Sequence, residues 1–143
     1  MTRYPPIRPS PDSGDGRDEM AVITFDDILG LTAHLPGVTE STSYGTPALK
    51  VRGKSFCRLW SEREYERDAV HDTEVLVVFC DVDEKPLLIE MSGGSLFTTA
   101  HYDGHGAVLI RLKDIPRHEL AERLEESYLL KAPPSLRKDL GRR

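Results

Sequence analysis

Three side chains of one short loop have the types and spacing of a metal site. His101, Asp103 and His105 alternate along the segment, and imidazole and carboxylate groups are common ligands of transition metals. Alternating positions in a glycine-rich turn also arise without any ligand, and Asp103-Gly104 is an ordinary turn pair. A metal site would need a fourth ligand and supporting hydrogen bonds, which the sequence does not identify. We therefore expect a structural loop with no metal and no other cofactor.

Nothing in the sequence marks either cysteine as an ionised nucleophile. Cys57 and Cys80 each lie in an apolar run with the composition of a strand, where a thiol usually behaves as a small buried hydrophobic group. The chain has no glycine-rich phosphate loop, nucleophile elbow, paired-histidine zinc helix or Cys-x-x-Cys motif. We therefore expect no enzymatic activity, and two reduced thiols rather than a disulfide framework.

Positive charge is concentrated in two segments of an acidic chain. Residues 48–60 carry four cations and no acid, and residues 131–143 carry five cations and one acid. Because the whole chain has a formal net charge of −5, the remaining residues carry −13. Clustered cations contact the phosphates of nucleic acids, but they also protect the edges of sheets from association. Charge alone leaves both interpretations open.

The size and composition of the chain indicate one domain that positions these groups. It has 143 residues, of which 38% are hydrophobic and 30% charged. We expect a disordered Pro- and Gly-rich tail over residues 1–19, a single domain over 20–136 and a basic tail over 137–143. No apolar run is long enough for a membrane span, and no secretory signal is apparent. We therefore expect a cytoplasmic protein that does not associate with membranes.

Hydrophobic periodicity predicts a helix near each end of the chain. Thr24 is the expected N-cap of a helix over residues 25–34. Asp114 and Pro116 open the last helix, which ends at the prolines 133–134. Its expected buried stripe is Leu120, Ala121, Leu124 and Tyr128. A shorter helix is predicted over 83–91.

Short apolar runs predict strands between these helices. Residues 48–51 and 54–60 read as a hairpin around Arg52-Gly53, and further strands are expected over 75–80, 96–99 and 107–112. Residues 62–72 alternate in charge and are expected to form a solvated loop or to extend both flanking strands. The order predicts an α+β fold, in which an antiparallel sheet carries the N- and C-terminal helices on one face.

Three blocks of sequence, in this order, resemble the MmcQ/YjbR family. They are Leu35–Glu40 (LPGVTE), Tyr44–Phe56 (YGTPALKVRGKSF), and His101–Gly104 (HYDG) followed by Val108–Leu112. The similarity extends from about Thr24 to Leu136. It implies a compact α+β fold like that of the frataxin-type CyaY domain, and members of this family are commonly labelled DNA-binding proteins.

This chain departs from the family pattern at two places near the last block. Residues 92–95 (SGGS) stand where an acid–proline pair is usual, and His105-Gly106 stands where an aromatic residue and a proline are usual. These changes affect the loop that follows His101 and Tyr102, and leave the expected fold unchanged.

The resemblance and the charge pattern together predict a non-enzymatic DNA-binding protein. The expected phosphate contacts are Lys50, Arg52, Lys54 and Arg58, and His101 and Tyr102 are expected to stack on bases or to hydrogen-bond to them. Tyr44, Gly53 and Phe56 have structural explanations, with Gly53 in a turn and Phe56 in the core. The alternative is a protein-interaction or small-ligand-binding module with no nucleic-acid role.

Overall fold

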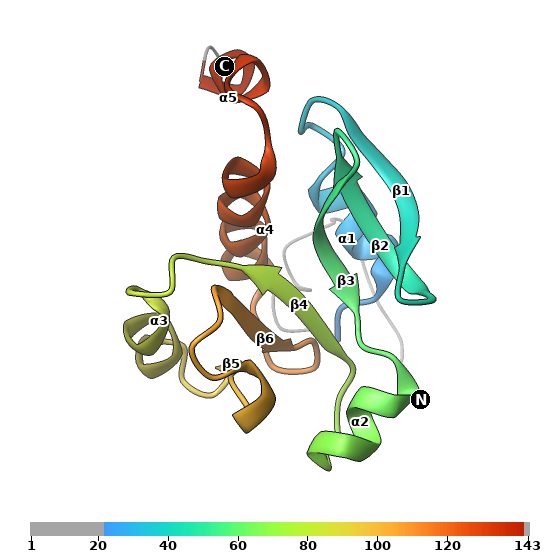
Figure 1. Ribbon diagram of the computed structural model, residues 1–143, viewed down its shortest axis with the longest axis vertical. Helices are drawn as coiled ribbons and strands as arrows, with labels where there is room; N and C mark the ends of the chain where they lie inside the picture. The colour runs from blue at the N-terminus through green and yellow to red at the C-terminus, as the bar shows by residue number, and fades with distance from the viewer. Residues whose placement is uncertain (1–21, 142–143) are drawn as a thin grey trace, which may run out of the picture.

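The structure, a computed structural model, describes residues 22–141 and has a six-stranded antiparallel sheet at its centre (Figure 1). The spatial order of the strands is β1-β2-β3-β4-β6-β5. The strands are β1 (Val38–Ser43), β2 (Thr46–Val51), β3 (Lys54–Leu59), β4 (Val75–Phe79), β5 (Leu96–Phe97) and β6 (Ala107–Arg111). The predicted hairpin and the predicted central strand are therefore confirmed, and β4 pairs with β3 on one side and with β6 on the other.

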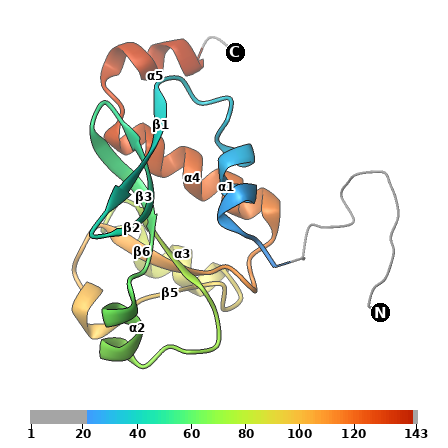
Figure 2. The ribbon, with the colours of Figure 1, turned by 90° about the vertical axis from the view of Figure 1, so that its right-hand side faces the viewer.

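Helices near the two ends of the described chain cover one face of this sheet. Figure 2 shows α1 (Phe25–Leu31) and α4 (Arg117–Lys131) on the same side of the strands. The other helices are α2 (Glu62–Asp68), α3 (Lys85–Met91), the short 3-10 helix η3 (Ala100–Tyr102) and α5 (Pro134–Gly141). The α+β class with helices at both ends is confirmed. Among residues 22–141, no helix combines the length and the hydropathy that crossing a bilayer requires.

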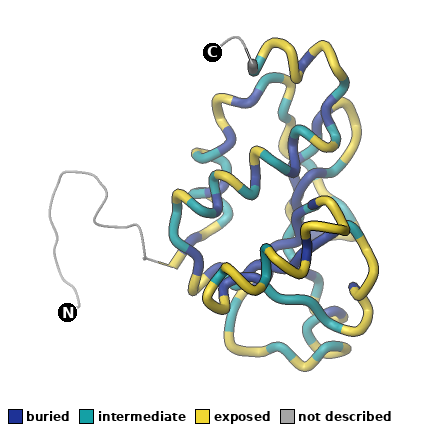
Figure 3. Tube along the Cα trace, turned by 90° about the vertical axis from the view of Figure 1, so that its left-hand side faces the viewer, coloured by how far each residue is buried: buried dark blue, intermediate teal, exposed yellow. Residues whose placement is uncertain are grey.

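The main core lies between the sheet and helices α1 and α4, and we call it the helical-side core. Thr24 caps α1 in a capping box with Asp27, and Ile28 of that helix is fully buried. Leu120, Leu124 and Tyr128 of α4 are buried at helical spacing, and Figure 3 shows buried and exposed residues alternating along the helices. Three members of the predicted stripe are thus confirmed, whereas Ala121 is only partly buried.

Three elements differ from the sequence-based expectation. Residues 62–68 form α2 rather than a loop, because Ser61 and Glu64 have capping-box spacing and satisfy the first turn of the helix. The polar segment before the hairpin forms β1, which as an edge strand needs no apolar face. Residues 137–141 belong to α5, whose Leu136 is buried. The predicted tail over 1–19 lies outside the described residues, as do 142–143.

The sheet opens between β3 and β4. Only three residue pairs join these strands, Cys57–Val78, Arg58–Val77 and Leu59–Leu76, and Figure 1 shows the strands diverging beyond them with α4 in view between them. Ser127 of α4 bridges the gap, since its hydroxyl accepts a hydrogen bond from the backbone N–H of Phe79 at 2.8 Å and donates one to the Phe56 carbonyl. The divergence leaves α4 in contact with both halves of the sheet.

Candidate functional site

A hollow of about 960 Å³ lies on the sheet face opposite α1 and α4, which we call the open face. Val77, Phe79 and Ala107 form its apolar floor. Val77 and Ala107 belong to a second buried cluster that also contains Trp60 and Tyr102 and is separate from the helical-side core. Helix α2 and η3 therefore cover one part of the open face, and the rest is left as the hollow.

The rim of the hollow is rich in positive charge. Its cations are Arg58, Arg63, Arg67 and Lys131, joined by His101 and His105. Among the described residues that line it, Glu64 carries the single carboxylate, and that carboxylate already forms an ion pair with Arg58 at 2.7 Å. Arg67 forms an ion pair with Asp68 at 3.0 Å, and Arg63 and Lys131 line the hollow beside its apolar floor.

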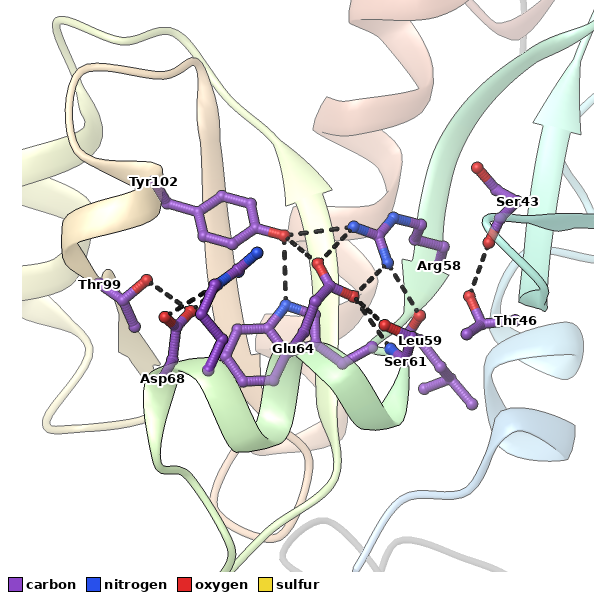
Figure 4. Close-up of polar contacts among 11 residues, drawn as sticks. Ser43, Thr46, Arg58, Leu59, Ser61, Glu64, Asp68, Thr99 and Tyr102 are labelled. Carbon is purple, nitrogen blue, oxygen red and sulfur yellow. Dashed lines mark hydrogen bonds and ion pairs between the residues drawn. The ribbon is translucent and has the colours of Figure 1, made fainter.

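Arg58, Glu64 and Tyr102 form a hydrogen-bonded network at one wall of the hollow (Figure 4). The two terminal nitrogens of Arg58 donate to the two carboxylate oxygens of Glu64 at 2.8 and 2.7 Å. The Tyr102 hydroxyl donates to the same carboxylate at 2.7 Å, and the Ser61 backbone N–H donates to it at 2.9 Å. The network ties β3, α2 and η3 together, so it fixes the shape of this wall.

The network controls the ionisation of its members. Burial alone would raise the pKa of Glu64, but the hydrogen bonds from Arg58, Ser61 and Tyr102 outweigh burial and lower the pKa to about 2. The Glu64 carboxylate also raises the pKa of Arg58. Burial, followed by the hydrogen bond to Glu64, raises the pKa of the Tyr102 hydroxyl. At neutral pH the pair is fully ionised and the phenol is neutral.

The Tyr102 ring is buried and is not free to contact a ligand. It is only 8% exposed, stacks on the Trp60 ring and receives a hydrogen bond from the Trp60 indole N–H at 3.3 Å. The loop after it is held by the buried Lys85, whose ammonium group donates to the Tyr102 carbonyl at 2.6 Å and to the His105 carbonyl at 3.3 Å. Burial lowers the pKa of Lys85. Tyr102 and Lys85 thus position the loop, and the exposed His101 ring lies against Tyr102 at its outer side.

Lys131 reaches the hollow from the opposite layer of the protein. It is the last residue of α4, and the divergence of β3 and β4 lets its side chain line the open face. Its ammonium group lies 4.0 Å from the centre of the Phe79 ring. This cation–π contact holds a positive charge over the floor of the hollow.

The predicted contact residues fall into two groups. Arg58, His101 and Tyr102 line the hollow. Lys50 lies between Leu49 and Val51, which belong to the helical-side core, so it points to the open face. Arg52 and Lys54 are exposed at the β2–β3 turn, where Arg52 and Gly53 both have positive φ. The structural roles expected for Gly53 and the buried Phe56 are confirmed.

Several lining residues were not identified from the sequence. Arg63, Glu64 and Arg67 lie in the segment expected to be a loop, and the Ser61–Glu64 spacing was the signal that could have placed them on a helix. Tyr44 was expected to be structural, yet its side chain is 83% exposed at the rim of the hollow. No feature of the sequence indicates that the side chain of Lys131, at the end of α4, lines the hollow on the open face of the sheet.

The histidines of the loop and the two cysteines lie apart in the part of the chain that the structure describes. Among residues 22–141, no three His, Cys, Asp or Glu side chains lie where they could share a metal ion. Cys57 and Cys80 are both buried and free. Burial raises the pKa of Cys57 to about 12 and also raises the pKa of Cys80, so both thiols are protonated at neutral pH.

Comparison with known proteins gives consistent results. The YjbR family model matches residues 33–130. Uncharacterized proteins of Mycobacterium tuberculosis and Mycobacterium bovis are 43% identical over 121 residues, covering 79% of this chain and 92% of theirs. A crystal structure of a Deinococcus radiodurans protein with a DUF419 domain has the same fold, with a TM-score of 0.61 at 24% identity, over 86% of this chain and 91% of that one. The protein described here is therefore a member of the YjbR family.

Proposed function

We propose that this protein binds DNA without catalysing a reaction, and that its open face carries the phosphate contacts. One observation carries the proposal. Among the described residues that line the hollow, four cations and two histidines accompany a single carboxylate, which Arg58 already neutralises. Phosphate oxygens prefer such a surface, and their binding releases counterions. The apolar floor beside it suits the sugar and base of a nucleotide.

Arg63 and Lys131 are the principal phosphate contacts in this proposal. Within residues 22–141, neither side chain has a carboxylate within ion-pair distance. Arg67 is partly neutralised by Asp68 at 3.0 Å. Arg58 is a positioning residue, because its terminal nitrogens are occupied by Glu64, and Tyr102 supports it from the same network.

The basic hairpin extends this surface. Lys50 lies on the open face, and Arg52 and Lys54 lie at the β2–β3 turn. They continue the positive charge from the hollow along the strands, so a ligand that contacts both regions must be longer than a single nucleotide. A polymer of phosphates meets this requirement.

A small phosphorylated ligand is the second candidate. The volume of the hollow, about 960 Å³, lies at the upper end of the range of small-molecule sites. Such a ligand would fill the hollow and leave the hairpin unused. Substitutions at the hairpin therefore distinguish the two candidates.

The proposal is tested by fluorescence anisotropy with labelled DNA over a series of salt concentrations. Arg63→Ala or Lys131→Ala should each weaken binding and reduce the salt slope by up to about one unit, because one phosphate contact is lost. A Lys50→Ala, Arg52→Ala, Lys54→Ala triple variant should reduce the slope further. Because each phosphate contact releases counterions, the affinity should fall as salt is added.

Matched controls come from the helical layer. Arg123→Ala removes an arginine from the smaller hollow that α4 lines with Glu122, Glu125 and Glu126, and Lys138→Ala removes an exposed lysine from α5. Both should leave the salt slope unchanged. Absence of binding at low salt, or equal losses in the open-face variants and these controls, would contradict the proposal.

A further inference from the structure

Tyr44 is an exposed aromatic residue at the rim of the hollow. It lies in the two-residue turn that joins β1 to β2, where Ser43 pairs with Thr46. Its side chain is 83% exposed, more than that of any other large hydrophobic residue among those described as exposed. The ring is therefore not part of the core, and most of its surface is open to a ligand.

The backbone at this position favours a different residue. Tyr44 has φ 54° and Gly45 has φ 79°, as in the hairpin turns in which both central residues have positive φ. Asparagine and glycine adopt this conformation readily, whereas a tyrosine does so at a conformational cost. Departures of this kind concentrate at functional sites.

The Tyr44 ring is supported from one side. The guanidinium carbon of Arg58 lies 4.9 Å from the centre of the ring, and Arg58 is itself held by Glu64. The turn is fixed by the Thr46 hydroxyl, which donates to the Ser43 carbonyl at 2.9 Å (Figure 4). The Tyr44 ring therefore contacts Arg58 and leaves most of its surface exposed to solvent, where a base could stack on it.

We propose that the open face binds DNA as a single strand, with the Tyr44 ring stacking on an unpaired base while Arg63 and Lys131 contact the backbone beside it. This inference rests on the proposed function and adds to it the class of DNA. Stacking on aromatic side chains is a main source of affinity for single strands. The cation–π contact with Arg58 restrains the Tyr44 ring and so lowers the entropy cost of stacking.

Stacking on Tyr44 favours a single strand over a duplex. In duplex DNA the bases are paired and stacked inside the helix, so a base reaches a hollow of this kind only when it is unpaired and turned out. That step costs free energy that a single strand does not spend. The preference for a single strand should therefore be roughly tenfold or greater.

The test compares a fluorescent oligothymidylate with a labelled duplex of the same length in anisotropy titrations at low salt. Tyr44→Ala should lower the affinity for the single strand roughly 5- to 100-fold and leave the affinity for the duplex within about twofold. Tyr44→Phe keeps the ring and should retain the affinity of the wild type. Neither variant should alter the salt slope, because no charge is removed.

Leu87→Ala serves as the matched control, because Leu87 is another exposed large side chain, on α3 away from the hollow. It should bind like the wild type, and circular dichroism should confirm that all variants are folded. Equal binding of both DNA forms by the wild type, or equal losses for both in Tyr44→Ala, would overturn the inference and leave the proposed function standing. Binding of neither form would overturn both.

Discussion

The two faces of the sheet are built on different principles. The face toward α1 and α4 is closed by aliphatic and aromatic side chains, among them Ile28, Leu124 and Tyr128, which are all essentially inaccessible to solvent. The open face is only partly covered, and it carries the hydrogen-bonded network of Arg58, Glu64 and Tyr102. The helical side is held by apolar burial throughout, whereas the open face combines a smaller apolar cluster around Trp60 with a polar network beside a hollow.

We infer that the two faces have different roles, one in the stability of the fold and the other in the contacts with a ligand. Apolar burial is nondirectional and scales with area, so it can fix a fold without presenting specific groups to a ligand. A hydrogen-bonded network is directional and holds charged groups in defined positions at the edge of solvent. The helical-side core therefore provides most of the stability, and the open face provides the positions of the candidate contacts.

The largest expected effect is a loss of stability on the helical side. Leu124→Ala removes a fully buried side chain of α4 and should lower the free energy of unfolding by about 2–5 kcal/mol. Leu130→Ala is the same substitution on the same helix, but Leu130 is 47% exposed, so its effect should be no more than about 1 kcal/mol. Urea denaturation measures both. Similar losses in the two variants would show that this face does not dominate stability.

Sequence patterns predict the helical side more accurately than the open face. Helical spacing of Leu120, Leu124 and Tyr128 predicts a buried stripe, because the period of a helix appears directly in the order of residues. The apolar run over 75–80 predicts a central strand for the same reason. Such local patterns depend on neighbours in the chain, so a sequence is sufficient to detect them.

The open face could not be predicted in the same way. Glu64 and Tyr102 are 38 positions apart, and Arg58 and Tyr102 are 44 apart, so their contact depends on how α2 and η3 fold back on the sheet. Helix α2 has few apolar residues and reads as a solvated segment. The basic hairpin was recognised by composition, but the engagement of Arg58 by Glu64 becomes apparent only in three dimensions.

A smaller effect is expected when the network on the open face is broken. Glu64→Gln keeps the helix cap, since glutamine also serves in a capping box, but leaves the Arg58 guanidinium without its charged partner. The free energy of unfolding at neutral pH should fall by about 1–3 kcal/mol. Lys113→Gln removes one member of an exposed pair with Asp72 and should change stability by less than about 0.5 kcal/mol. Equal effects of the two substitutions would argue against a structural role for the network.

The last and smallest expected effect is a difference in how the two faces respond to acid. Glu64 has a pKa of about 2 in the folded protein, below its ordinary value of 4.5, so the folded state favours the ionised carboxylate. The stability that the carboxylate contributes is therefore fully present above about pH 4.5 and is lost as the pH falls towards 2. The stability difference between the wild type and Glu64→Gln should shrink over this interval.

Leu124→Ala provides the contrast in the same measurement, because neither residue titrates. Its loss of stability relative to the wild type should stay nearly constant from pH 7 to about pH 3, although both proteins lose stability in acid. Urea denaturation of the three proteins at several pH values gives both differences. A constant difference for Glu64→Gln would show that the carboxylate is not held in its ionised form by Arg58 and Tyr102. The open face would then be positioned by packing, as the helical side is, and the distinction between the two faces would no longer hold.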